Sequence, residues 1–417
     1  MTPPPPRAPK LAYLVSAYPA ISHTFILREV RRLRALGYDI VTASINRPDR
    51  PLDAMGPYER REALATYVLK ADGVRGALAA LLFWLGHAPG RLLRMLAFGV
   101  RLADRRRPWV GLAYGIEAAM VARWMQREDT AHLHVHFGNV GASVGMLVKR
   151  LNGCHLSYTI HGPDEFDDIA GQQLALKMQE ADAVVCISQF ARGQLMRISH
   201  PAVWSKFLLC RLGVAPTQFR FSLRGNGPVT RLLCVGRLTP AKCQVLLVQA
   251  CARLRDEGVA FHLTLVGAGP DHARVEQAVL DLRLEGRVTM TGALNEHDVR
   301  EQFERADVFV LPSLAEGIPV VLMEAMASGV PVVTTPVNGI PELVEHGQTG
   351  LLARPGDVES LAQQIRLLVE DPTLRRPLAI AARAKVLAEF DLARNVAALG
   401  RIFDTFPHAA PGPVRAV

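Results

Sequence analysis

Cysteines and aromatic residues are scarce in this chain, and no apolar stretch of membrane-spanning length runs without interruption. The 417 residues include 6 cysteines, which have neither the spacing of a zinc ribbon nor that of a disulfide framework. The most apolar stretch, 76–100, is broken by His87, Arg91 and Arg94, whereas a spanning helix needs about 20 mostly apolar residues. We therefore expect a reduced, cytoplasmic protein without a membrane-spanning segment.

The composition also argues against an export signal and against disorder. The apolar segment 11–21 lacks the usual charged lead-in of a signal peptide and continues into a helical pattern, as the first strand of a βα unit does. Hydrophobic residues make up 49% of the chain and charged residues 21%, which is far from the apolar-poor composition of a disordered chain. A chain of this length predicts two domains rather than one.

The net charge of +9 is unevenly distributed. Between residues 75 and 107, arginines are interleaved with leucines and aromatic residues at helical spacing. This pattern fits a helix that lies on an anionic membrane surface, and it fits equally two ordinary packed helices whose surface is lined by arginine stems. Both interpretations stay open. Nucleic acid is not an expected partner, because no aromatic-rich binding signature accompanies the charge.

Strand and helix patterns alternate along most of the chain, which predicts an α/β protein whose parallel sheets are covered by helices. We predict an N-terminal Rossmann-like domain over 1–216, a proline- and glycine-rich linker over 217–230 and a C-terminal Rossmann-like domain over 231–387. A last helix within 388–417 is expected to cross back to the N-terminal domain. Two doubly wound domains predict a cleft between them, because ligands of such sheets bind beyond the carboxyl ends of the strands.

The segment from Ser313 to Pro331 follows a strand pattern and is the most informative part of the sequence. Pro319 fits the start of a helix, so Glu316 is expected in the preceding loop and Glu324 on the helix. The free N–H groups of a helix start favour a phosphate, and a carboxylate accepts paired hydrogen bonds from vicinal hydroxyls. Two carboxylates beside an anion site predict a ligand with hydroxyls at both ends of a diphosphate.

Two further motifs follow strand patterns in the same predicted domain. Gly236-Arg237-Leu-Thr-Pro-Ala-Lys242 provides a planar guanidinium and a point charge beside a backbone that can approach phosphate closely. It lacks the Gly-Lys-Ser/Thr of a P-loop, which excludes that class of nucleotide hydrolase. Gly267-Ala-Gly269 resembles part of a dinucleotide fingerprint, but His272 stands where the third glycine belongs, so NAD is not predicted.

Residues 313–331 and their continuation to Asp357 resemble the signature of the retaining nucleotide-sugar glycosyltransferases of family 4. The resemblance is dense in the second predicted domain and thinner in the first. It implies the GT-B fold, with two Rossmann-like doubly wound parallel-sheet domains facing a cleft. It further implies that Glu316 contacts the donor sugar and that Glu324 holds the ribose hydroxyls.

The resemblance also implies how the diphosphate is bound and which other residues touch the donor. Arg237 and Lys242 would bind the diphosphate and stabilise the departing nucleotide. That role fits the absence of any Asp-x-Asp triplet, since two protein cations replace a metal ion. We therefore expect neither a metal nor a cofactor. The remaining donor contacts are expected at Gly236, Gly267, Gly269, Gly292, Gly317, Ile318 and Pro319.

In the first domain, His161 resembles the histidine that many family members place beside the reacting sugar. We expect it to be catalytic together with Glu316, Arg237 and Lys242. On the acceptor side, the turn around Ser22, His23 and Thr24 resembles the Pro-x-x-Ser-Glu-Thr-Phe turn of the polysaccharide branch, except that position 23 is histidine rather than glutamate. This departure leaves the acceptor open. The other acceptor-side candidates are His136 and Asp164.

His132, His134 and His136 alternate along one strand pattern and therefore share one face of the sheet. Three histidines are able to ligate zinc. No further ligand is evident nearby in the sequence, so we do not predict a metal there.

These observations predict a retaining glycosyltransferase that moves a sugar from a nucleotide diphosphate-sugar to a hydroxyl of a glycan or lipid-linked oligosaccharide. The expected setting is exopolysaccharide or cell-envelope polysaccharide synthesis, at the inner face of the cell membrane if the basic helices bind lipid. The alternatives are a nucleotide-sugar 2-epimerase of the same architecture and a non-catalytic nucleotide-sugar-binding protein. The presence of Arg237, Lys242 and Glu316 favours the transferase.

Overall fold

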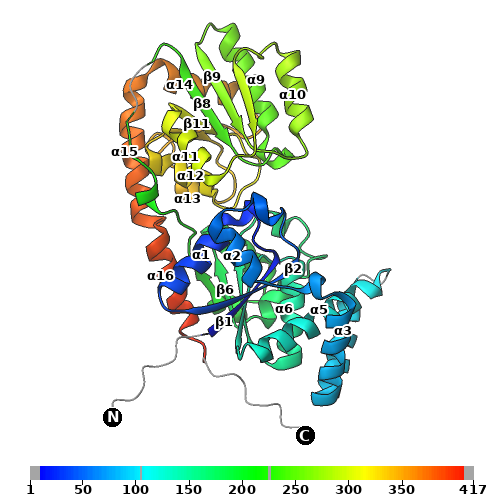
Figure 1. The fold of residues 1–417 in the computed structure, drawn as a ribbon. Coiled ribbons are helices and arrows are strands. Elements are labelled where there is room, and N and C mark those ends of the chain that lie inside the picture. Colours follow the sequence, from blue (N-terminus) through cyan, green and yellow to red (C-terminus); the bar gives the residue numbers. More distant parts are fainter. Residues whose placement is uncertain (1–9, 104–105, 224–226, 408–417) are drawn as a thin grey trace, which may run out of the picture. The chain divides into compact units, whose positions relative to one another are not determined.

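The computed structural model describes residues 10–103, 106–223 and 227–407, and it divides the chain into two compact units (Figure 1). Unit 1 comprises Met1–Ile187, Ala191–Cys210 and Val396–Val417. Unit 2 comprises Ser188–Phe190 and Arg211–Asn395.

Unit 1 is built on a seven-stranded sheet in the order β3-β2-β1-β4-β5-β6-β7, in which every strand pair is parallel. Its strands are β1 (Lys10–Ala17), β2 (Asp39–Asn46), β3 (Tyr67–Val68), β4 (His132–His136), β5 (His155–Ile160), β6 (Ala183–Cys186) and β7 (Phe207–Leu209). The central strands are buried on both faces, as the almost continuous apolar run of β1 indicates.

Helices cover both faces of this sheet. They are α1 (Thr24–Ala35), α2 (Pro57–Ala65), α3 (Leu69–His87), α4 (Pro89–Leu102), α5 (Pro108–Arg127), α6 (Val140–Asn152), α7 (Leu174–Glu180), α8 (Gln189–Ile198) and α16 (Leu392–Phe403). The helices α3 and α4 both pack on α5, and α5 packs on α6. At the crossing of α4 and α5, a side chain at Gly111 would clash with the carbonyl oxygen of Gly99, 2.0 Å from the added Cβ. The two helices therefore approach as closely as their backbones allow.

Unit 2 is a second parallel sheet, with six strands in the order β10-β9-β8-β11-β12-β13. Its strands are β8 (Thr230–Val235), β9 (Phe261–Val266), β10 (Val288–Gly292), β11 (Val308–Leu311), β12 (Val332–Thr334) and β13 (Leu351–Leu352). Its helices are α9 (Gln244–Asp256), α10 (His272–Asp281), α11 (Glu296–Arg305), α12 (Val320–Ser328), α13 (Ile340–Leu343), α14 (Val358–Glu370) and α15 (Pro372–Glu389). In Figure 1, α9 and α10 lie on one side of this sheet; α12 packs on α15.

The last helix of the chain belongs mostly to unit 1. The Phe403 ring packs edge-on against Tyr13 of β1, with centroids 6.2 Å apart, and the Tyr38 hydroxyl donates to Asp404 over 2.8 Å. Residues 211–223, part of which we expected as linker, pack with unit 2, where Phe219 is buried. The fold class is therefore the one expected, two Rossmann-like doubly wound domains; the cleft between them stays a prediction.

Within the described part of the chain, none of the helices has both the length and the hydropathy required to cross a bilayer.

Candidate functional site

In unit 2, the predicted donor residues gather at the carboxyl edge of the sheet. The loops that follow β8, β9 and β10 are joined by backbone hydrogen bonds: the Gly236 amide donates to the Val266 carbonyl over 2.9 Å, and the Gly267 amide donates to the Gly292 carbonyl over 2.8 Å. The loop after β11 joins the same edge, because the Leu314 amide donates to the Ala241 carbonyl over 2.7 Å. Four strand ends therefore present their loops together.

Two glycines of this edge are required by close backbone contact. A Cβ at Gly267 would lie 2.0 Å from the Gly236 carbonyl oxygen, and a Cβ at Gly269 would lie 2.3 Å from the Leu238 carbonyl oxygen. Gly267 also has a φ of 143°, in the region that favours glycine. The Gly-Ala-Gly segment thus allows two strand-end loops to touch.

An ion pair joins the two main motifs of unit 2. The Lys242 ammonium donates to Glu316 Oε1, and the Ser313 hydroxyl donates to the same oxygen over 2.7 Å. Glu316 is buried and Lys242 is half-buried. The pair holds a cation and a carboxylate beside each other at the carboxyl edge of the sheet. Chemically, the cation is suited to bind a phosphate and the carboxylate to accept a hydrogen bond from a hydroxyl.

The remaining predicted donor residues lie on the same loops or on the helix that follows β11. Arg237 is exposed directly after Gly236, and it forms no ion pair with any residue that the structure describes. Gly317 and Ile318 lie in the loop before α12, and Pro319 caps the start of that helix. Glu324 is half-buried and lies at the middle of α12. We expected Pro319 as the first helical residue; its ψ of 121° makes it the cap instead.

In unit 1, His161 follows β5 in a loop that a buried carboxylate holds. The amides of His161 and Gly162 each donate to Glu165 Oε2 over 2.6 Å, and the Gly138 amide donates to the other oxygen of the same carboxylate. Gly138 follows β4, so Glu165 ties the loops of two neighbouring strands together. We had considered the exposed Asp164 nearby, and not Glu165.

A buried lysine completes this arrangement. The Lys177 ammonium donates to the carbonyl oxygens of Gly138 and Asn139 over 2.7 and 2.9 Å. Burial raises the pKa of Glu165 to about 7, against the effect of its three backbone donors. Burial also lowers the pKa of Lys177 to about 7, and the nearby Glu165 opposes that shift. The two groups form a clamp, which we call the Glu165–Lys177 clamp.

His161 lies against a second histidine. Its Nε2 is 3.1 Å from Nδ1 of His136, so one ring donates to the other. His136 Nε2 lies 3.3 Å from Glu29 Oε1, and Glu29 accepts a hydrogen bond from the Tyr13 hydroxyl over 2.9 Å. Burial, together with His136 and His23, holds the pKa of His161 well below its usual value. The imidazole is therefore neutral near pH 7.

His136 was expected on the acceptor side, but its exposed fraction is 0%. It has no surface available to an acceptor in this structure, and its contact is with His161. The sequence places it at the end of β4, where such residues commonly face a ligand. Packing of Tyr13 and His134 against its ring, with centroids 5.5 and 5.0 Å away, accounts for the difference.

The structure brings one carboxylate to the histidines of β4. Glu29, His134 and His136 offer ligand atoms that lie within 4.8 Å of one another, and all three residues are buried. Both ring nitrogens of His134 already contact hydroxyls, Ser157 Oγ at 2.7 Å and Thr159 Oγ1 at 2.9 Å. His132 Nε2 contacts the same Ser157 at 2.7 Å. His132 and His134 therefore belong to a buried hydrogen-bond network with Ser157 and Thr159.

The acceptor-side turn lies next to His161 through two aromatic rings. Ser22 and His23 belong to the short helix η1 (Ile21–His23), and Thr24 begins α1. The His23 and Phe137 rings have centroids 4.9 Å apart, and the Phe137 and His161 rings 4.5 Å apart. Phe137 has a φ of 70°, which is unusual for a bulky residue and typical of functional sites. The structure therefore assembles His23 and His161 around Phe137.

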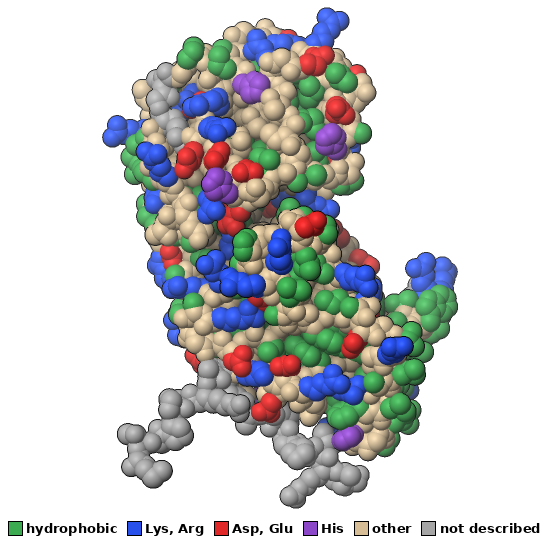
Figure 2. Space-filling view, in the orientation of Figure 1, with side chains coloured by type: hydrophobic (Ala, Val, Ile, Leu, Met, Phe, Trp, Pro, Cys, Tyr) green, Lys and Arg blue, Asp and Glu red, His purple; other side chains and the backbone are tan. Residues whose placement is uncertain are grey.

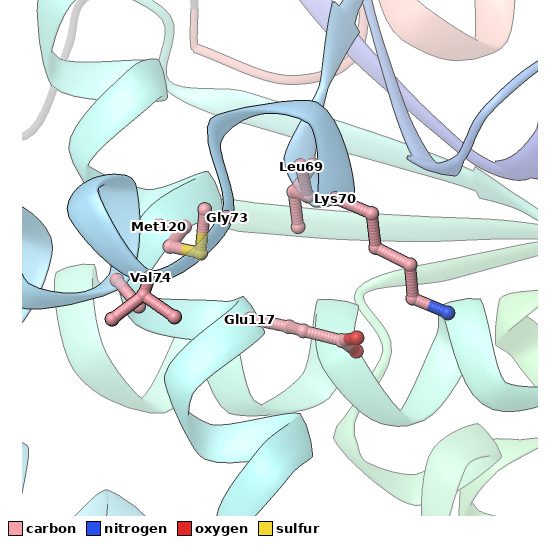
Figure 3. A pocket seen from close by; sticks show the side chains of 7 residues that line it. Leu69, Lys70, Gly73, Val74, Glu117 and Met120 are labelled. Atoms are coloured by element: carbon pink, nitrogen blue, oxygen red, sulfur yellow. The ribbon is translucent and has the colours of Figure 1, made fainter.

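A pocket of about 280 Å³ lies elsewhere in unit 1, beside the start of α3 (Figure 3). None of the predicted site residues lines it. Its lining consists of Leu69, Lys70, Gly73, Val74, Ala77, Glu117 and Met120.

Residues 217–385 match the family model described as "Glycosyl transferases group 1". Over 403 residues, which are 92% of this chain and 96% of the relative, the chain is 30% identical to the amylovoran biosynthesis glycosyltransferase AmsK of Erwinia amylovora. It is 29% identical, with the same shares covered, to the putative colanic acid biosynthesis glycosyltransferase WcaL of Escherichia coli.

Solved structures show the same fold. Sucrose-phosphate synthase from Thermosynechococcus elongatus has a TM-score of 0.74 at 20% identity, with 95% of this chain and 98% of that chain covered. HepE from Anabaena, solved in complex with UDP-glucose, has a TM-score of 0.72 at 19% identity, with 95% and 100% covered. Both are GT-B architectures, with two parallel sheets flanked by helices.

Proposed function

Because the chain belongs to the group 1 glycosyltransferases, we propose that it transfers a sugar from a nucleoside diphosphate-sugar to a hydroxyl of a growing exopolysaccharide. The observation that supports this most is the Lys242–Glu316 ion pair at the carboxyl edge of the unit 2 sheet. The names of the relatives AmsK and WcaL support a polysaccharide product, and the UDP-glucose bound to HepE supports the donor class.

Each donor residue then has a definite task. Lys242 and Arg237 bind the diphosphate oxygens, one as a point charge and the other as a planar fork. Glu316 accepts hydrogen bonds from hydroxyls of the donor sugar, and Glu324 accepts them from the ribose. Gly236, Gly267, Gly269 and Gly292 let the nucleotide approach the backbone, as do Gly317, Ile318 and Pro319 before α12.

The reaction proceeds with retention at the anomeric carbon. The bond between that carbon and the leaving phosphate oxygen breaks on the same face on which the acceptor oxygen bonds, and the acceptor proton passes to the leaving phosphate. Lys242 and Arg237 stabilise the negative charge that develops on the diphosphate. His161 supplies a neutral imidazole that hydrogen-bonds a sugar hydroxyl, and no carboxylate of the chain acts as a nucleophile.

The same two cations make a metal ion unnecessary for the leaving group. Activity in the presence of EDTA tests this directly: we expect no loss, and complete loss that Mg²⁺ or Mn²⁺ restores would contradict it.

The acceptor is proposed to be a lipid-linked oligosaccharide, with Ser22, His23, Thr24 and Asp164 on the side that receives it. These residues lie in unit 1, where the η1 turn adjoins His161 through Phe137. The acceptor sugar itself is open, because His23 departs from the family's glutamate.

A panel of UDP-, GDP- and ADP-sugars identifies the donor by thermal stabilisation, because a ligand that binds only the folded state raises the Tm. The stabilising donor is then incubated with lipid-linked acceptor from an exopolysaccharide-producing strain, and the product linkage is determined by NMR. An axial donor linkage that stays axial supports retention. Conversion of the donor without acceptor would identify an epimerase, and stabilisation without any turnover would identify a binding protein.

A further inference from the structure

An apolar surface without a partner lies on the outer helices of unit 1. In α3, Val74, Leu78, Leu82 and Leu85 follow one another at helical spacing and are all exposed, Val74 by 75% and Leu82 by 68%. Leu93 and Val100 on α4, and Trp109 and Leu112 on α5, are also exposed, and α3 and α4 both pack on α5. We call these eight residues the α3–α5 surface. Figure 2 shows hydrophobic side chains gathered over this part of the molecule, at the lower right.

The exposed residues of α3 are not its core face. The opposite face buries Leu69, Ala80 and Trp84, and the Trp84 indole N–H donates to the Ala119 carbonyl over 3.0 Å. Trp84 is only 1% exposed. Because α3 already has a packed inner face, the exposed stripe is apolar surface that the fold of unit 1 does not use. Contiguous apolar patches of this kind mark interaction sites.

The charge around the stripe is almost entirely positive. The exposed arginines of the same helices and of the following turn are Arg75, Arg91, Arg94, Arg101, Arg106 and Arg107. Between Leu69 and Trp109, Asp72 is the single carboxylate among the described residues, and it accepts a hydrogen bond from Tyr67 over 2.9 Å. Arg75, Arg91 and Arg94 form no ion pair with any described residue, so their charges are not neutralised within unit 1.

We propose that the α3–α5 surface binds an anionic lipid bilayer. Helices that present leucine and tryptophan between arginines insert the apolar side chains at the acyl boundary, while the arginines contact lipid phosphates. A second copy of the chain is disfavoured, because a symmetric interface would place arginine-rich surfaces against each other. The proposal concerns a surface remote from Lys242 and Glu316 in the chain, and it does not depend on the transfer reaction.

The full-length chain is tested by co-sedimentation with vesicles of phosphatidylcholine containing 30% phosphatidylglycerol, and with vesicles of phosphatidylcholine alone. We expect binding to the anionic vesicles, at least tenfold weaker binding to the neutral ones, and weakening by 0.5 M NaCl through screening. The triple variant L78Q/L82Q/L85Q is expected to bind anionic vesicles at least tenfold more weakly, because three apolar side chains that insert at the acyl boundary are replaced by polar ones.

A matched control keeps the result interpretable. The triple variant L280Q/L367Q/I380Q removes three similarly exposed apolar side chains from unit 2 and is expected to bind vesicles as the unchanged chain does. A charge variant, R75E/R91E/R94E, is expected to lose the preference for anionic lipid. Far-UV circular dichroism with a cooperative thermal transition checks that each variant is folded.

Three results would overturn the proposal. The first is no binding to anionic vesicles. The second is equal loss of binding in the unit 2 control, which would indicate non-specific adsorption. The third is a dimer on gel filtration that L78Q/L82Q/L85Q converts to a monomer without any effect on vesicle binding, which would assign the surface to a second copy of the chain.

Discussion

The two units place their polar site residues differently on the same kind of sheet. In unit 2, half-buried Lys242 pairs with buried Glu316, and neighbouring Arg237 is exposed. In unit 1, buried groups hold the corresponding edge in place. His136 contacts His161, and the Glu165–Lys177 clamp binds the loops that follow β4 and β5. The two cations of unit 2 are at least partly exposed and available to a ligand, whereas the buried polar groups of unit 1 hold loops in place. The following variants distinguish these two uses.

The largest effect is expected from the clamp. Lys177 donates to two backbone carbonyl oxygens, and a buried polar group left without a partner costs about 1–3 kcal/mol, so K177M should lower the free energy of unfolding of unit 1 by about 2–5 kcal/mol. All four tryptophans, Trp84, Trp109, Trp124 and Trp204, lie in unit 1, so urea unfolding followed by tryptophan fluorescence reports this unit. K385M in unit 2 is the control. A midpoint shift as small as that of K385M would show that the hydrogen bonds of Lys177 do not stabilise unit 1.

At the rim of unit 2, the expected effect is on catalysis and not on folding. K242A removes the charge that stabilises the departing diphosphate and should lower kcat about 100- to 1,000-fold, with the tryptophan unfolding transition unchanged. Initial rates with saturating donor measure it. K385A, another half-buried lysine of unit 2 that pairs with a carboxylate, should leave kcat unaltered. A kcat reduced less than threefold in K242A would remove Lys242 from the mechanism.

A smaller effect, on binding, is expected from Glu324. Hydrogen bonds to a charged group contribute about 1.5–3 kcal/mol, so E324A should raise the KM for the donor about 10- to 150-fold and change kcat much less. Calorimetric titration with the free nucleoside diphosphate checks the same contact without turnover. E304A, an exposed carboxylate on α11, serves as the control. Unchanged nucleotide affinity in E324A would refute the ribose contact.

The smallest effect is the pH dependence of unit 1. Burial and the neighbouring His136, His132 and His161 hold the pKa of His134 well below its usual value. As the pH falls below about 6.5, His134 is protonated in the unfolded chain but stays neutral in the folded chain. The free energy of unfolding therefore falls by up to about 1.4 kcal/mol per pH unit.

The variant H134Q should remove that part of the slope, measured by tryptophan fluorescence between pH 5 and 7. His161 contributes with the same sign. Glu165 contributes with the opposite sign, because its raised pKa favours the folded state as the pH falls from 7 toward 4.5. The difference in slope between H134Q and the unchanged chain isolates His134. Equal slopes would mean that His134 is protonated in the folded chain, whereas H297Q, at an exposed position, should not alter the slope.

Predictions from the sequence were most complete where the site residues are close in the chain. Gly236 to Lys242 and Ser313 to Glu324 are short segments at strand ends, so strand periodicity alone placed them on one edge of the sheet, as the structure has them. The residues that were missed come from separate elements. Glu165, which follows β5, accepts a hydrogen bond from the amide of Gly138, which follows β4. Lys177 on α7 donates to the carbonyl of the same glycine. The sequence signal for this arrangement was a glutamate close to His161.

The outer helices of unit 1 show the same limit. The alternation of arginines with leucines and aromatic residues over 75–107 fits either membrane-binding helices or ordinary packed helices. Trp84 is part of the core, and the exposed stripe runs through Val74, Leu78, Leu82 and Leu85. In a helix that is apolar nearly all round, periodicity does not reveal which face packs inward.

The sequence by itself determined the α/β class, the pair of doubly wound sheets and the composition of the donor edge, because each depends on patterns within one strand–loop–helix unit. Only the tertiary structure decided that His136 is buried behind His161, that Glu165 and Lys177 hold the loops of unit 1, and which face of α3 remains open. Those outcomes depend on the order of strands in the sheet and on which helix packs against which, and contacts between residues far apart in the chain carry no local signature.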